Sequence, residues 1–446
     1  MPAPKKLFKS HNFCARTLDI GTMSDASDTD ACSTEPSDEE DRWLFAASLL
    51  PGSVAEILRL KRDDTEVTRF SLFQDMNEET SRRLSHILGQ NTRLTDLNLP
   101  CNFDVAGLCA GLQTNRFIQV FALMGGVDLS GVVEMNRLVP FLVNNPSFVV
   151  IHLFHCNIGP DSIGILVEAL SSCSASTLRG LNLGGNNFGG VDLGPLCQAL
   201  AQERHSGLTE LHLPNCGIGQ HGCASLATLL QGHSSRGPQV LNLCQNAIND
   251  QSARVLADFL DRNSRLMTLD LTQNSGITAH GWQAFLDLVC DTRSMGHTRA
   301  SNHTLCSLGD ANPFDHGFPS QTFVGVLGAD DANFLDALLA LNGNSDKTLV
   351  VKHKLIWSHI QGRSNIGDCP LVAGLMPQVL ACFSAFPNEV DALFLHPHRP
   401  RPSDLELAVM RLEATFRILR SRFDLCQAGS DPPCNARVKV EENYTG

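Results

Sequence analysis

Leucine and other apolar residues recur along the middle of the chain in one short pattern, LxxLxLxxN or LxxLxLxxC, where x is any residue. The segments read LTDLNLPCN, FVVIHLFHC, LRGLNLGGN, LTELHLPNC, PQVLNLCQN and LMTLDLTQN, and they begin at Leu94, Phe148, Leu178, Leu208, Pro238 and Leu266. From Phe148 onward the starts are separated by 30, 30, 30 and 28 residues. This regular spacing indicates that the chain is built from repeated units.

Each unit predicts a strand followed by a helix. The fourth and sixth positions, such as Leu97 and Leu99, are two residues apart, so both side chains point to one side of a strand. After the strand, apolar residues recur every three or four positions in segments that end at Leu170, Leu230 and Leu260, which predicts helices. Ser162 and Ser252 are expected near the helix starts as N-caps. Stacked units of this kind predict an α/β fold, a curved solenoid with a parallel sheet on its concave side and helices on its convex side.

The ninth position of each unit requires a side chain that satisfies backbone groups where the chain turns away from the strand. Asparagine serves as both donor and acceptor, and cysteine serves as a small buried group. The residues at this position are Asn102, Cys156, Asn186, Cys216, Asn246 and Asn274. The alternation of Cys and Asn resembles the ribonuclease-inhibitor-like subclass of leucine-rich-repeat proteins, and the resemblance covers about 94–288.

Three places depart from the regular spacing. The segment FIQVFALMG, taken to begin at Phe117, lies 23 residues after Leu94 and 31 before Phe148 and has no asparagine. The segment from Val67 is interpreted as a degenerate first repeat with Asp75 at the asparagine position. A last candidate begins at Leu305, 39 residues after Leu266, so 291–304 is interpreted as an insertion or an altered repeat. The array is therefore expected to span 67–310.

The flanking segments predict four further regions. Residues 1–42 are rich in Asp, Glu, Ser and Thr, which is typical of a disordered acidic tail, and 43–66 are expected to form a helical cap. Residues 311–426 are interpreted as a helical C-terminal cap region, followed by a disordered tail at 427–446. Helices are expected at Ala332–Leu341, Leu371–Phe383 and Ser403–Phe423. The last carries an a/d heptad stripe, which suits either packing on the array or pairing with another chain.

Composition narrows the classes of partner. The chain has 47 Asp and Glu against 34 Lys and Arg, a formal net charge of −13, which disfavours a nucleic acid because phosphate binding needs a basic stripe. No stretch is long and apolar enough for a membrane span. The 16 cysteines show no zinc-type spacing. With a polar N-terminal segment, the cytoplasm is the expected location, with the nucleus as the alternative.

No constellation indicates catalysis, a cofactor or a metal. Phosphate-loop, HExxH and GxSxG motifs are absent from the sequence. One GxGxxG match, at Gly217, Gly219 and Gly222, falls where every repeat places a turn, so it is attributed to the repeat. His152 and His212 recur at one repeat position and are interpreted as surface residues of the sheet. The chain is therefore expected not to be an enzyme.

Side chains at the third, fifth and seventh positions are expected to face solvent on the concave sheet. Phe121, Leu123, Val150 and Phe154 would form an exposed apolar patch, and such patches mark interaction sites. The alternative is that the N-terminal segment or the insertion covers them. The expected partner-binding residues are Phe121, Leu123, Val150, His152, Phe154, Asn182, Glu210, His212, Asn242 and Asp270.

Three functions follow from this face. The first is a scaffold or adaptor that binds another protein on the concave sheet. The second is activation of a small GTPase, since some proteins of the resembled subclass are similar to the activator of the Ran GTPase. The third is inhibition of a basic enzyme, which the acidic charge favours electrostatically.

Overall fold

The computed structural model describes residues 44, 49–99, 103–174, 177–231, 237–309, 326–356 and 358. The chain divides into two compact units, residues 1–48 and 49–446. The repeats all lie in the second unit.

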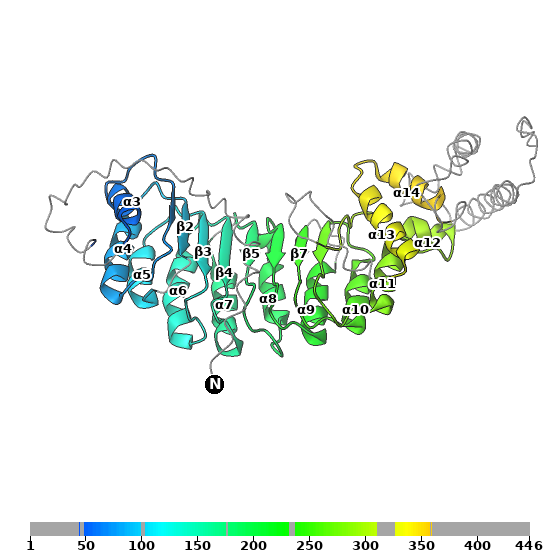
Figure 1. Cartoon of the computed structure of the whole chain (residues 1–446), viewed down its shortest axis with the longest axis horizontal. Helices are drawn as coiled ribbons and strands as arrows, with labels where there is room; N and C mark the ends of the chain where they lie inside the picture. The colour runs from blue at the N-terminus through cyan, green and yellow to red at the C-terminus, as the bar shows by residue number, and fades with distance from the viewer. Residues whose placement is uncertain are drawn as a thin grey trace, which may run out of the picture. The chain divides into compact units, whose positions relative to one another are not determined.

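The second unit contains one parallel sheet whose eight described strands follow one another in sequence order (Figure 1). This confirms the α/β solenoid predicted from the repeat spacing. A parallel bridge between Thr268 and Ser307 continues the sheet by one residue pair, which confirms that a last, altered repeat begins near Leu305. The strands are β1 (Arg69–Ser71), β2 (Asp96–Leu99), β3 (Val120–Met124), β4 (Val150–Phe154), β5 (Gly180–Asn182), β6 (Glu210–His212), β7 (Val240–Asn242) and β8 (Thr268–Asp270).

Helices follow the strands and cover one side of the sheet, which leaves the other side as the concave sheet face (Figure 1). Helices α7, α9 and α10 end within two residues of the predicted positions. The helices are α3 (Pro51–Lys61), α4 (Glu78–Gln90), α5 (Val105–Leu112), α6 (Val132–Asn144), α7 (Pro160–Ser172), α8 (Gly194–Leu200), α9 (Gln220–Leu230), α10 (Asp250–Leu260), α11 (Ala279–Val289), α12 (Met295–Ala300), α13 (Ala329–Asn342) and α14 (Lys347–Ile356).

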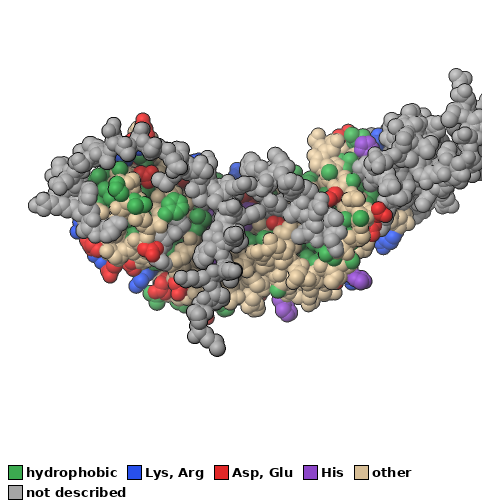
Figure 2. Space-filling model, in the orientation of Figure 1, with side chains coloured by type: hydrophobic (Ala, Val, Ile, Leu, Met, Phe, Trp, Pro, Cys, Tyr) green, Lys and Arg blue, Asp and Glu red, His purple; other side chains and the backbone are tan. Residues whose placement is uncertain are grey.

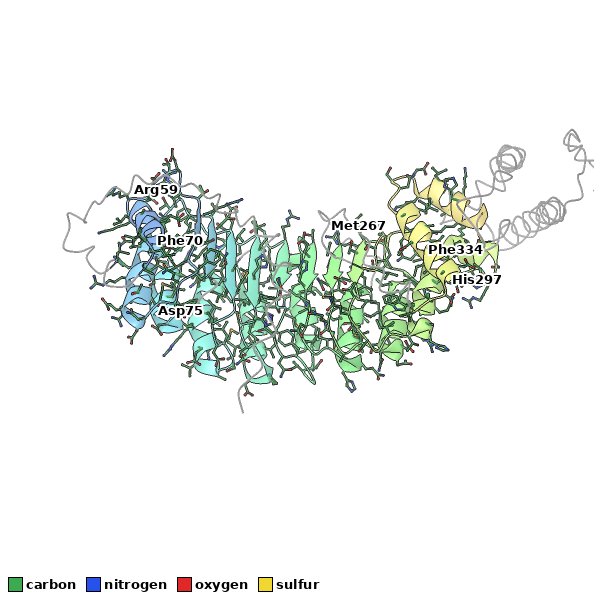
Figure 3. The ribbon with its side chains drawn as sticks, in the orientation of Figure 1. Arg59, Phe70, Asp75, Met267, His297 and Phe334 are labelled. Carbon is green, nitrogen blue, oxygen red and sulfur yellow. The ribbon has the colours of Figure 1, made fainter. Side chains whose placement is uncertain are left out.

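The core lies between the sheet and the helices, and the fourth and sixth positions of each repeat fill it. Phe70 near one end of the array and Phe334 on α13 near the other are both buried (Figure 3). On the outer surface of α4, Glu78 and Glu79 pair with Arg82 and Arg83, and acidic and basic side chains gather at that end of the molecule (Figure 2). These exposed pairs contribute little to stability.

The predicted asparagine ladder is present at the ninth position. The Nδ2 group of Asn186 donates to the carbonyls of Leu153 and Leu183, both at 2.7 Å. Its Oδ1 accepts the N–H groups of Cys156 and Ile158 at 3.1 and 2.9 Å. One side chain therefore satisfies backbone groups of two consecutive repeats. Asn246 and Asn274 make the corresponding contacts, whereas Asn102 lies outside the described residues.

A second ladder was not predicted from the sequence. It stands three residues before the first apolar position of a repeat, and its members are buried. For example, Nδ2 of Asn115 donates to the carbonyl of Leu88 at 2.8 Å, and its Oδ1 accepts the N–H of Ile118 at 3.1 Å. His205 takes the same place, with Nε2 donating to the carbonyl of Leu170 at 2.9 Å. The asparagines of this ladder are Asn91, Asn115, Asn145, Asn263 and Asn302.

Two expectations about local structure were wrong. Ser162 and Ser252 stand at the third helical position and not at the N-cap, which is Gly159 in α7 and Asn249 in α10. Asn249 is the better cap because its Oδ1 accepts the N–H of Ser252 at 3.0 Å.

Helix α13 confirms the helix expected at Ala332–Leu341, and α14 was not predicted. Helix α14 carries Lys354, whose ammonium is completely buried. Its Nζ donates to the carbonyls of Val289 and Asn302 at 2.7 and 2.9 Å and to Nδ1 of His303 at 3.0 Å. Burial lowers the pKa of Lys354 to about 7. The helices expected at 371–383 and 403–423 lie outside the described residues.

Candidate functional site

The concave sheet face carries the third, fifth and seventh positions of the repeats, but two of the expected binding residues are not on it. Phe121 and Leu123 are 0% and 1% exposed. Strand pairing aligns Phe121 with Ile151 and Leu123 with Leu153, which are core positions. The prediction that Phe121 and Leu123 form an exposed patch was therefore wrong.

The cause is a shift of one residue in the repeat register. The repeat assigned to Phe117 begins at Ile118, because β3 pairs Val120 with Val150 and Ala122 with His152. A shift of one residue exchanges the two faces of a strand. The side chains of this repeat that reach the concave face are Val120, Ala122 and Met124.

The corrected register places a different apolar patch on this face. Val120 and Met124 on β3 and Val150 and Phe154 on β4 are paired across the two strands, and all four are partly exposed. Beside Phe154, a Cβ at Gly184 would lie 2.8 Å from the Phe154 ring and 2.7 Å from Pro214. Glycine is therefore required there for the rings to close over β5. We define Val120, Met124, Val150 and Phe154 as the apolar patch.

The fifth positions of the repeats align across the sheet as one row, the fifth row, which is polar from β4 to β8 but contains Ala122 on β3, and it is less exposed than expected. Asn182, Asn242 and Asp270 are buried. The Oδ1 atom of each accepts the N–H two residues ahead, from Gly184, Cys244 and Thr272, at 2.9 Å in every case. These side chains therefore fix the ends of their own strands in addition to facing the concave side.

The central part of the face holds a small electrostatic cluster. Oε2 of Glu210 lies 3.4 Å from Nε2 of His212, and this contact holds the pKa of Glu210 below its usual value despite partial burial. Burial, with a smaller contribution from nearby His212, lowers the pKa of His152 to about 4. At neutral pH the cluster therefore presents an ionised carboxylate beside a neutral His152.

This cluster predicts a pH dependence of stability. His152 titrates at about pH 4 in the folded state and near 6.5 when unfolded, so the unfolded chain binds more protons between these values. Stability is therefore lost as the pH falls from 6.5 to 4. Over this pH range, we expect the free energy of unfolding of His152→Asn to fall by about 3 kcal/mol less than that of the wild type, since one pKa unit corresponds to about 1.4 kcal/mol. Urea unfolding at each pH measures this free energy. The same pH dependence in both proteins would contradict the lowered pKa of His152.

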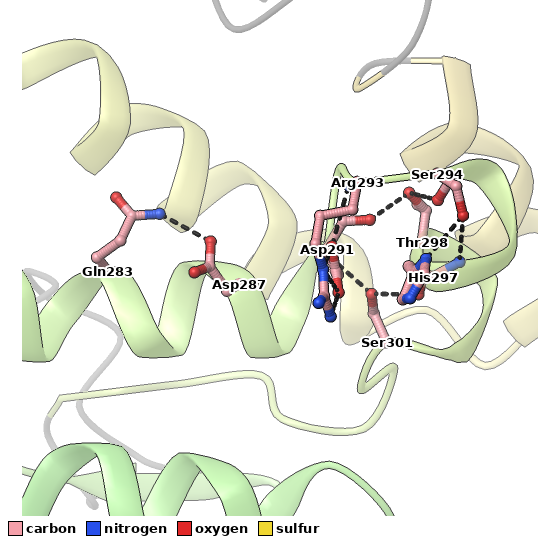
Figure 4. Close-up of polar contacts among 8 residues, drawn as sticks. All are labelled: Gln283, Asp287, Asp291, Arg293, Ser294, His297, Thr298 and Ser301. Atoms are coloured by element: carbon pink, nitrogen blue, oxygen red, sulfur yellow. Dashed lines mark hydrogen bonds and ion pairs between the residues drawn. The ribbon is translucent and has the colours of Figure 1, made fainter.

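A second group of polar side chains lies on the helical side, between α10, α11 and the segment that follows α11. A cavity of about 580 Å³ there is lined by side chains that include Arg254, Asp258 and His280. At its edge, Asp291 forms a two-oxygen ion pair with Arg293, and Gln283 donates to Asp287 (Figure 4). This cavity could not be predicted from the sequence because its residues belong to no motif.

One pair beside this cavity resembles a nucleophile and its base. Oγ of Ser294 lies 2.7 Å from Nδ1 of His297 (Figure 4). However, the same oxygen accepts the backbone N–H of His297 at 3.3 Å, and Ser294 is the N-cap of α12. The carboxylate of Asp291 is paired with Arg293 and does not orient the imidazole by a hydrogen bond. The arrangement is therefore that of a helix cap.

The glycine motif also has a structural role. Gly217 has a φ of 67°, the left-handed conformation of the turn after β6. A Cβ at Gly222 would lie 2.8 Å from Ile218. Among the described residues no cluster of three His, Cys, Asp or Glu is placed to hold a metal ion. No helix in this part of the chain is long and apolar enough to cross a membrane.

Comparison with known proteins finds relatives over the array. Ribonuclease inhibitor of Mus musculus is 30% identical over 172 residues, which cover 38% of this chain and 36% of the relative. Ribonuclease inhibitor of Sus scrofa is 30% identical over 160 residues, 36% of this chain and 33% of the relative. NACHT, LRR and PYD domains-containing protein 5 of Homo sapiens is 31% identical over 133 residues, 30% of this chain and 11% of the relative. The chain thus spans about a third or less of these relatives. No family model matches it.

Among solved structures, the leucine-rich-repeat-containing protein LegL7 of Legionella pneumophila is 18% identical, with a TM-score of 0.43 over 72% of this chain and 98% of that one. The tropomodulin C-terminal domain of Caenorhabditis elegans is 14% identical, with a TM-score of 0.27 over 40% of this chain and 90% of that one. The fold is established by the repeat geometry itself, namely the strand order, the two buried ladders and the alternation of Cys156, Asn186, Cys216 and Asn246. This geometry shows that the chain is a leucine-rich-repeat solenoid, and its repeats are similar in sequence to those of the ribonuclease inhibitors.

Proposed function

We propose that this protein is a scaffold that binds another protein on its concave sheet face and has no catalytic activity of its own. The observation that carries the proposal is the apolar patch beside Glu210. Four apolar side chains on two adjacent strands are partly exposed, and an ionised carboxylate lies two strands away. Apolar anchors beside a charged group are typical of protein interfaces. Relatives with leucine-rich repeats support protein binding in general.

Capture of a partner from a lysate of the source cells tests the proposal. We expect Met124→Asp with Phe154→Asp to lose a partner that the wild type retains, because two buried contacts of the interface would become charged. The double variant should unfold at nearly the same urea concentration as the wild type, since both side chains are partly exposed. The matched control is Glu168→Lys on the exposed side of α7, which should retain the partner. An identical set of captured proteins for all three would show that the interface lies elsewhere.

The captured partner also separates the alternatives. A small GTPase whose GTP hydrolysis is accelerated would favour the activator hypothesis. A basic enzyme that is inhibited would favour the inhibitor hypothesis, in keeping with the similarity of the repeats to ribonuclease inhibitors. A partner of another kind would favour the adaptor.

A further inference from the structure

Three polar side chains of the fifth row have hydrogen-bonding capacity that the protein leaves unused. Oδ1 of Asn98 and Nδ2 of Asn242 are buried and have no hydrogen-bond partner among the described residues. The ring of His152, which is 8% exposed, makes no hydrogen bond within the described part of the chain. Burying an unpaired polar group lowers stability. The acceptor role of Asn242 towards Cys244 explains its Oδ1 but not its free Nδ2, and no hydrogen bond within the described residues explains a polar side chain at Asn98 or His152.

The unused groups lie in one line across the sheet. Asn98, His152 and Asn242 stand on β2, β4 and β7 at equivalent register positions. Neighbouring strands are about 4.8 Å apart, so Asn98 and Asn242 are separated by about 24 Å, the length of about seven extended residues. The line offers an acceptor at one end and a donor at the other. These match the N–H and C=O groups of a peptide main chain.

The surroundings specify the side chains of such a peptide. Glu210 is next to this line and partly exposed, and its carboxylate, 3.4 Å from Nε2 of His212, is ionised at neutral pH as an ordinary glutamate is. It would pair with a lysine or arginine. On the other side of β5, Val150 and Phe154 offer apolar contacts.

We propose that the fifth row binds the main chain of an extended segment of the partner, with a lysine or arginine of that segment placed over Glu210. The proposal rests on the proposed function and deepens it by naming the chemistry that is recognised. Asn242 is completely buried, so binding at this end of the row requires the side chains around it to move apart. The unpaired groups are thereby satisfied in the complex.

An array of octapeptides tests this proposal with the full-length protein as probe. Each peptide set is random except for one position, which is fixed as Lys, Glu or Leu. We expect retention of sets with a fixed lysine and its loss in Glu210→Lys but not in Glu168→Lys. N-methylation of single backbone amides in the best peptide should weaken its binding at least tenfold at two or more positions. Retention independent of a basic residue or of the backbone amides would overturn the proposal.

A variant at one of the unpaired groups separates binding from folding. We expect Asn98→Leu to weaken peptide binding about tenfold without lowering the midpoint of urea unfolding; Asn242 is left unchanged in this test because its Oδ1 accepts the N–H of Cys244. A purely structural role would lower the midpoint instead. If Met124→Asp with Phe154→Asp abolishes partner capture but no octapeptide is retained, the partner presents a folded surface, and only the extended-segment proposal fails. If capture is also unaffected, both proposals fail.

Discussion

Phe121→Asp is expected to unfold the repeats around β3, whereas Phe154→Asp is expected to leave the fold intact. The ring of Phe121 packs edge-on against Phe141 at a centroid distance of 5.0 Å and lies 6.3 Å from Phe148. Removing a buried Phe side chain costs about 3–5 kcal/mol, and a buried unpaired carboxylate adds to this. The total is comparable to the stability of a typical domain.

The effect should be local at first, because each repeat contacts only its neighbours. Hydrogen exchange should show lost protection in β2, β3, β4, α5 and α6 before the repeats near β7 respond. Phe121→Leu is the conservative control and should cost much less, since the site remains apolar. Wild-type protection in folded Phe121→Asp would mean that the assigned register of β3 is incorrect.

The register error at Phe121 shows what the sequence could predict and where it was ambiguous. From Phe148 onward, one polar residue separates the core leucines in most repeats, so the alternation specifies the face. In FIQVFALMG the residues around Val120 are nearly all apolar, so both registers place apolar groups in the core. The spacing of Asn115 to Ile118 resolves the ambiguity, because the same spacing joins Asn145 to Phe148. The second ladder therefore carried the missing signal.

The candidate site was less predictable than the fold. Repeat positions correctly located Val150, Phe154, Glu210 and His212 on the concave side. They did not show that fifth-row amides bond to their own strand ends, because side-chain rotamers are not encoded in spacing. The cavity between α10 and α11 was also missed. Its residues come from separate elements, and their proximity depends on how the last repeats pack.

The two ladders explain why most side chains on the concave sheet face are not needed to hold the fold. The ninth-position asparagines satisfy backbone groups at the turn after each strand, and the second ladder does so before the strand. With both turns fixed from inside the core, third-row and seventh-row side chains are not needed to hold the fold. Under the proposed function, these positions are the ones that can carry specificity for a partner at little cost in stability, whereas the unpaired groups of Asn98 and Asn242 lower stability.

Lys354→Met is expected to detach α13 and α14 from the array while β1 to β8 stay folded. A hydrogen bond joins Nζ of Lys354 to the carbonyl of Val289, 65 residues earlier in the chain. Among the described residues, no carboxylate is a partner of Nζ. His303 donates from Nε2 to the carbonyl of Arg299 at 2.9 Å, so its Nδ1 accepts from the lysine. Methionine matches the lysine in length but leaves two carbonyls and Nδ1 without this donor. The expected loss is about 2–4 kcal/mol.

Hydrogen exchange measures the detachment as lost protection confined to 329–356, with Lys352→Met on the same helix as the matched control. The pH dependence gives a second readout. Because the pKa of Lys354 is lowered to about 7 and an exposed lysine titrates near 10.4, the detached state binds more protons above pH 7. Docking of these helices should therefore strengthen as the pH rises from 7 towards 9 in the wild type and stay level in Lys354→Met. Unchanged protection in Lys354→Met at every pH would show that apolar packing alone holds the two helices. The buried Lys354 side chain would then have no role in docking.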